Sequence, residues 1–117
     1  MQENFKISML LDYYGKLITA RQYEIIDMYF NEDCSLGEIA EQLAISRQGV
    51  YDNIRKGSAL LNEFENKLGL VAKYNDNKTL IRNIEKEIDD LLDRSKDKVI
   101  INKLVEIKNK LKHITEN

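Results

Sequence analysis

Residues 35–61 read SLGEIAEQLAISRQGVYDNIRKGSALL, and this stretch decides the fold of the chain. Its first half carries one apolar stripe at helical spacing, made of Leu36, Ile39, Ala40 and Leu43. Ser35, followed by Glu38, predicts a capping box, in which each side chain accepts a hydrogen bond from a backbone N–H of the first turn. Residues 44–46 leave room only for a sharp turn, and Ser46 is a good N-cap for a second helix. We therefore predict two helices joined by a tight turn.

The second of these helices has two distinct faces. At about 100° per residue, one side gathers residues that would pack on the first helix: Val50, Ile54, Gly57 and Leu61. The opposite side gathers polar residues: Arg47, Gln48, Tyr51, Asp52 and Arg55. This layout is typical of a helix-turn-helix, whose second helix offers its N-terminal residues to a groove of nucleic acid. The alternative is an ordinary helical hairpin whose polar face meets water, and periodicity alone does not separate the two.

The whole chain has the composition of a folded helical protein. Of its 117 residues 43% are apolar and 32% are charged, which suits a folded rather than a disordered chain, and the absence of proline favours long helices. No run reaches the roughly 18–20 apolar residues of a membrane span, and the N-terminus does not resemble a secretory signal. Cys34 is the only cysteine, so no internal disulfide can form and a reducing cytoplasm is expected.

Helices are also predicted on both sides of residues 35–61. Residues 2–14 form an amphipathic pattern that we expect Gly15 to end in a left-handed conformation. Thr19 and Gln22 predict a second capping box and a second helix. The helix that begins after Ser46 should continue to Gly69, which gives four helices and a first domain over residues 1–69.

Residues 70–117 read as an antiparallel helical hairpin. Two heptad-like seams are separated by a charged stretch, one with Ile81, Ile84, Ile88 and Leu91, the other with Ile100, Leu104, Ile107, Leu111 and Ile114. Residues 75–77 (Asn-Asp-Asn) are a weak point where the first arm is expected to fray or to begin late. Because the apolar faces are wide, the hairpin should pack on the first domain or on a second subunit, and we expect a homodimer.

The charge balance argues against a simple transcription factor. Formal net charge is −2 for the whole chain. Residues 1–69 hold seven basic and eleven acidic side chains, which gives −4, and residues 70–117 hold eleven basic and nine acidic, which gives +2. A free-standing DNA-binding domain usually carries a basic footprint, because neutralising phosphates supplies most of its affinity.

The sequence offers no convincing catalytic or cofactor site. It has no glycine-rich phosphate loop, and its one histidine, His113, lies far from Cys34, so no metal site and no cofactor are expected. His113 is placed as a cation near a helix end would be. The most economical explanation of the remaining carboxylates is a solvent-exposed helix face, made of Glu85, Glu87, Asp89 and Asp90. We therefore do not expect an enzyme.

Three segments together resemble the YlxM family of small bacterial proteins, also called UPF0122. They are LLDYYGKLIT (10–19), SLGEIAEQLAISRQGVYDNIRK (35–56) and LL-x-x-FENKLGL (60–70). The family is similar to region 4 of the primary sigma factors in its helix-turn-helix. The resemblance therefore implies an all-α fold in which a sigma region 4-like helix-turn-helix precedes the C-terminal hairpin.

The resemblance also implies a function, because family members are associated with the signal recognition particle pathway. It implies a non-catalytic accessory protein that binds the particle RNA or its GTPase. The expected contacts are Arg47, Gln48, Tyr51, Asp52, Asn53, Arg55 and Lys56, with a secondary basic strip of Lys103, Lys108, Lys110 and Lys112. Two alternatives stay open, namely a DNA-binding transcriptional regulator and a protein–protein interaction module that binds no nucleic acid.

Overall fold

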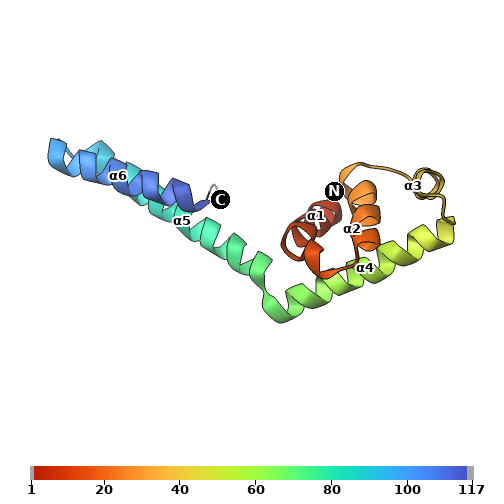
Figure 1. Ribbon diagram of the computed structural model, residues 1–117. Coiled ribbons are helices and arrows are strands. Elements are labelled where there is room, and N and C mark those ends of the chain that lie inside the picture. The colour runs from red at the N-terminus through yellow and green to blue at the C-terminus, as the bar shows by residue number, and fades with distance from the viewer. Residues whose placement is uncertain (1, 116–117) are drawn as a thin grey trace. The chain divides into compact units, whose positions relative to one another are not determined.

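The computed structural model describes residues 2–115, and every regular element in that range is helical (Figure 1). The helices are α1 (Gln2–Tyr14), α2 (Ala20–Ile26), α3 (Leu36–Leu43), α4 (Arg47–Leu68), α5 (Leu70–Arg94) and α6 (Lys98–Thr115). A 3₁₀ turn at Gly15–Leu17 follows α1, and a π-helical turn at Asp27–Asn31 extends α2. The described residues fall into two compact units, and the boundary between them in the chain lies between Val71 and Ala72. The all-α prediction, with a helix-turn-helix followed by a helical hairpin, is confirmed.

The first unit is built around α4. Figure 1 shows α1 and α2 lying across α4, with α3 near the N-terminal end of α4, and all three contact it. One buried cluster joins α1, α2 and α4 and consists of Ile7, Leu10, Leu11, Tyr14, Ile26 and Leu61. The other joins α2, α3, α4 and the π-helical turn and consists of Ile25, Met28, Ile39, Ala40 and Val50. The second cluster therefore holds the helix-turn-helix to the rest of the unit.

Local sequence signals set several helix ends. The Thr19–Gln22 capping box is present, with both side chains accepting backbone N–H groups at 3.1 and 3.0 Å. Gly69 ends α4 in the left-handed conformation, with φ +64°. Helix α1 ends at Tyr14, directly before Gly15 as predicted, but the predicted left-handed conformation of Gly15 was wrong, because its φ is not positive. Gly15 is needed for space instead, since a Cβ there would stand 2.6 Å from the ring of Tyr23.

The α1 helix, the end of α4 and the start of α5 meet at one buried hydroxyl. The Tyr14 hydroxyl donates to Oε1 of Glu65 at 2.6 Å and accepts from the backbone N–H of Leu70 at 3.1 Å. The same Glu65 oxygen accepts from the backbone N–H of Val71 at 3.0 Å. Glu65 and Tyr14 therefore satisfy the first N–H groups of α5, which have no partner within that helix.

The second unit is the antiparallel pair of α5 and α6. Helix α5 runs without interruption through residues 75–77. The prediction that the first arm frays or begins late there was therefore wrong. Residues 95–97 reverse the chain, and Oδ1 of Asp97 accepts from the backbone N–H of Val99 at 2.9 Å. Lys108 on α6 reaches Asp89 on α5 at 2.6 Å, which ties the two helices together.

Candidate nucleic-acid interface

The helix-turn-helix is fixed by caps on both of its helices. Ser35 and Glu38 form the predicted capping box at the start of α3. The turn begins at Ala44 in the left-handed conformation, with φ 57° and ψ 44°, and Ser46 caps α4 by accepting from the N–H of Gly49 at 2.9 Å. Ile39 and Val50, both 0% exposed, pack in one cluster and hold the two helices together. The first turns of α4 consequently keep their outer face in solvent.

The seven predicted contact residues on α4 divide into free and engaged side chains. The exposed ones are Arg47, Gln48, Tyr51, Arg55 and Lys56, while Asp52 and Asn53 are half-buried. Gln48 donates through Nε2 to Oδ1 of Asp52 at 3.1 Å, so these two polar groups satisfy each other. Asn53 donates to the backbone carbonyl of Gly49 at 2.8 Å and thus binds its own helix.

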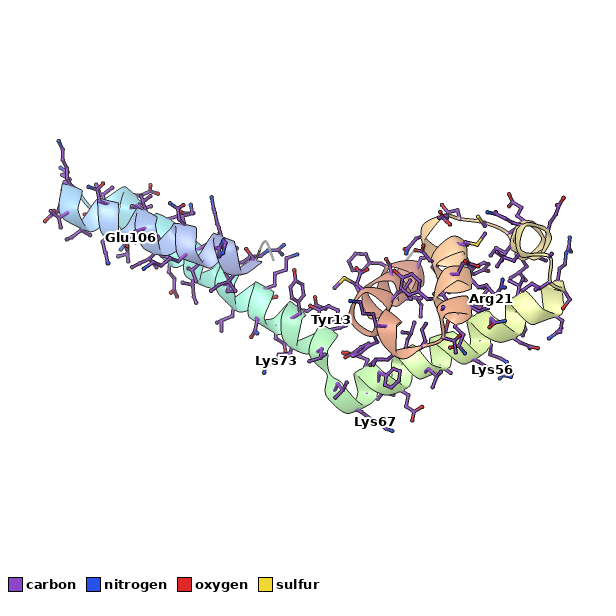
Figure 2. The ribbon with its side chains drawn as sticks, viewed as in Figure 1. Tyr13, Arg21, Lys56, Lys67, Lys73 and Glu106 are labelled. Atoms are coloured by element: carbon purple, nitrogen blue, oxygen red, sulfur yellow. The ribbon has the colours of Figure 1, made fainter. Side chains whose placement is uncertain are left out.

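The free side chains are cations and one aromatic ring. Within residues 2–115, Arg47, Arg55 and Lys56 form no ion pair, and half of the Tyr51 side chain is exposed. Figure 2 shows Lys56 pointing away from the packed helices into solvent. Because Asp52 is held by Gln48, the outer face of α4 offers cations that phosphates attract and a ring on which a base can stack.

Arg47 is placed by a glycine that the sequence analysis did not single out. A Cβ at Gly37 on α3 would stand 2.8 Å from Nη2 of Arg47, so the guanidinium lies directly over the backbone of α3. A glycine inside a helix often marks such a close approach. That signal was present at Gly37, but it does not say which side chain comes near.

The lysines of the predicted secondary strip do not form one free surface. Lys108 pairs with Asp89 at 2.6 Å, and this hydrogen bond raises the pKa of Lys108. Lys103 and Lys110 both lie 3.6 Å from carboxylate oxygens of Glu106. Lys112 is exposed and has no ion pair in the described part of the chain. Most of the charge of this helix is therefore compensated locally.

Metal binding and thiol chemistry have no evident site. Among residues 2–115, no group of three or more His, Cys, Asp or Glu side chains is placed to hold a metal ion. Burial raises the pKa of the Cys34 thiol, and the carboxylates of Glu32, Glu38 and Asp33 raise it further. A thiol with a raised pKa is a poor nucleophile at neutral pH. Over the same described range, no helix combines the length and apolarity that crossing a membrane requires.

Comparison with known proteins places the chain in a family. A family model described as "Putative helix-turn-helix protein, YlxM / p13 like" matches residues 1–107. The chain is 54% identical over 88 residues to a UPF0122 protein of Acetivibrio thermocellus, with 75% of each chain covered. It is 40% identical over 108 residues to a UPF0122 protein of Thermoanaerobacter sp. (strain X514), with 92% of each covered. The family description names a helix-turn-helix. The chain therefore belongs to the UPF0122 family of YlxM/p13-like helix-turn-helix proteins.

Proposed function

We propose that the chain is a non-catalytic, cytoplasmic accessory protein of the signal recognition particle pathway, which acts as a homodimer. It binds the particle RNA or its GTPase through the outer face of α4. One observation carries the binding part of this proposal: Arg47, Arg55 and Lys56 are exposed, without ion pairs, on the helix that also exposes Tyr51. The pathway itself rests on the family resemblance and not on the geometry.

RNA is the ligand that this face suits best. The major groove of an RNA helix is deep and narrow, so proteins mostly read loops, bulges and ends, whose bases can stack on aromatic rings. A ring such as Tyr51 flanked by Arg47 and Arg55 supplies stacking and phosphate contacts together. The modest number of free cations favours a limited, localised contact rather than broad phosphate binding.

A DNA-binding regulator is the second candidate, favoured by the helix-turn-helix itself. In that role Arg47, Gln48 and Arg55 would contact base edges in a major groove. Gln48, however, already donates to Asp52, and reading an adenine would require breaking that bond. A module that binds protein alone is the third candidate, in which the same face meets a partner without phosphates.

A salt-titrated binding assay separates these candidates. The full-length protein is compared for binding to the particle RNA, the particle GTPase and mixed-sequence duplex DNA. The test variant is Arg47→Ala/Arg55→Ala, and the control is Lys6→Ala/Lys16→Ala, which removes the same charge from two exposed residues elsewhere in the first unit. We expect the test variant to weaken RNA or GTPase binding by at least about tenfold, with the control unchanged.

Each other result points to a different function. Equal and steeply salt-sensitive binding to RNA and DNA would show only phosphate attraction. DNA binding that survives salt and prefers certain sequences would replace the proposal with the regulator. If the folded test variant bound as tightly as the unaltered protein, the outer face of α4 would not be the binding surface.

A further inference from the structure

The hairpin of α5 and α6 buries little of its own apolar surface. In the second unit, over residues 72–115, Ile88 is the only buried apolar side chain, with 6% of its surface exposed. A small helical unit gains most of its stability from packing an apolar face, and isolated helices are marginal in water. The hairpin therefore needs a further surface against which to pack.

The apolar side chains left outside are concentrated on one face of the hairpin. On α6, Ile100, Ile107 and Ile114 recur at heptad spacing, and their side chains are 50%, 38% and 60% exposed. On α5, Leu80 and Leu91 are exposed and lie eleven residues apart, which returns to the same side of a helix. Leu91 and Ile100 line one groove between the helices, together with Leu104. This surface, named here the isoleucine face, spans both helices.

The opposite face of the hairpin is polar. It carries the Asp89–Lys108 ion pair, and a polar groove beside it is lined by Arg82, Glu85 and Lys86. Val105 lies on α6 toward this side, because it is two residues, or about 200°, away from Ile107. The hairpin is thus amphipathic as a whole, and only one of its faces requires a partner.

Charges border the isoleucine face with opposite sign on its two helices. Glu87, Asp90 and Arg94 line a groove beside Leu91 on α5, and the Arg94 guanidinium lies 3.7 Å from Asp90. Lys103 and Lys110 follow Ile100 and Ile107 by three residues on α6, which places them next to the isoleucines on the helix surface. Both lysines also lie 3.6 Å from Glu106. With Arg94 and Glu106 counted, two acids and one base leave −1 on the α5 border, and two bases and one acid leave +1 on the α6 border. A second copy turned by a two-fold axis presents the complementary order.

We propose that the isoleucine face binds the same face of a second copy of this chain, which forms a four-helix antiparallel bundle. A two-fold axis parallel to the helices sets α5 of each copy opposite α6 of the other. Glu87 and Asp90 then meet the Lys103 and Lys110 border of the partner copy. An arrangement with α5 against α5 would oppose like charges, which is unfavourable. This inference names the interface of the proposed homodimer and does not depend on the ligand of α4.

The first test measures molar mass in solution for matched variants of the full chain. Light scattering after size exclusion should give about twice the 13.7 kDa chain mass for the unaltered protein. Ile107→Lys places a charge in the isoleucine face and should give the monomer mass. Val105→Lys makes the same change at an equally accessible position (43% against 38% exposed) on the other side of α6 and should remain a dimer. A monomeric unaltered protein, a dimeric Ile107→Lys variant or a monomeric Val105→Lys variant would each overturn the proposal.

A second test reverses charges and leaves every apolar contact in place, so it does not depend on how Ile107→Lys folds. Lys103→Glu/Lys110→Glu should raise the dimer dissociation constant at least about tenfold, and adding Glu87→Lys/Asp90→Lys should restore it. If the first pair of substitutions left the dimer dissociation constant unchanged, or the second pair did not restore it, the arrangement with α5 opposite α6 would be excluded. RNA binding by the same variants is measured in a separate assay at high protein concentration. Loss of the dimer and loss of RNA binding are therefore distinguished.

Discussion

At the scale of single residues, Gly57 shows a glycine that is kept for packing and not for flexibility. A Cβ at this position would stand 2.5 Å from Cδ1 of Ile26 and 3.3 Å from Cβ of Gln22. Replacing a helical glycine with alanine gains about 1 kcal/mol of helix propensity, but forcing an atom into a packed core costs about 1–3 kcal/mol. Because Ile26 is fully buried, we expect Gly57→Ala to lower the free energy of unfolding by about 1 kcal/mol, measured by urea denaturation.

Two further variants decide whether this clash is the cause. Gly49→Ala is the matched control on the same helix, where the nearest atoms are the cap oxygen of Ser46 at 3.2 Å and Ile45 at 4.0 Å, and we expect no loss. Ile26→Val removes the obstructing Cδ1 atom, and alone it should cost about 0.5–1.5 kcal/mol. In the Gly57→Ala background it should cost less or stabilise. Purely additive effects in this cycle would show that Gly57 acts through something other than Ile26.

The same residues show what could be predicted from the sequence. The caps at Thr19, Ser35 and Ser46 were predicted because each joins residues three apart, so neighbouring letters carry the information. The hydrogen bond between Gln48 and Asp52 is equally local, since the two residues are four apart. It was missed only because both side chains were predicted to contact the ligand. The approach of Arg47 to Gly37 joins two helices, and no spacing along the chain predicts it.

At the scale of elements, the junction of α4 with α5 depends on a protonated tyrosine. Burial raises the pKa of Tyr14 above its ordinary value of 10.0, and the hydrogen bond to Glu65 raises it further. A raised pKa in the folded state means that the stabilisation is complete below the unfolded pKa and is lost as the pH rises through the folded pKa. Tyr14→Phe lacks both this hydrogen bond and its titration. We expect the variant to melt several degrees below the unaltered protein at neutral pH, with the difference shrinking above about pH 10.

Thermal melts of both proteins across neutral and alkaline pH measure this difference directly. Tyr29→Phe is the control, because Tyr29 is 36% exposed and its hydroxyl is not one of the partners at this junction. If the melting temperatures of the Tyr14→Phe variant and the unaltered protein stayed equally far apart at alkaline pH, ionisation of Tyr14 would not control the junction. The control should show no such convergence.

Elements also mark where sequence patterns mislead. Residues 75–77 have weak helix propensity, yet α5 continues through them, since a helix already formed on both sides adds a residue more easily than it starts anew. The predicted end at Gly69 is correct because a left-handed residue stops a helix whatever surrounds it. Strong stop signals could therefore be predicted from the sequence, and weak ones depended on the neighbouring turns.

At the scale of the whole molecule, the two units are stabilised in different ways. Eleven of the twelve buried apolar side chains of the described residues belong to the first unit, and the second contributes Ile88. The first unit can therefore fold on its own core, whereas the second depends on the proposed partner hairpin. The two heptad patterns predicted the helical hairpin. Several of their apolar residues, such as Ile100 and Ile107, are exposed in the hairpin itself, and the sequence does not indicate which surface covers them.

This difference predicts two unfolding transitions with different concentration dependence. Far-ultraviolet circular dichroism reports all helices, while the near-ultraviolet tyrosine signal comes mainly from the first unit, which holds five of the six tyrosines. If hairpins melt as they dissociate, each tenfold dilution should lower that transition by about 5–10 °C. The tyrosine transition should not move, and in the Ile107→Lys variant neither transition should depend on concentration. A single transition that is independent of concentration in the unaltered protein would mean that the hairpin is stable without a partner copy.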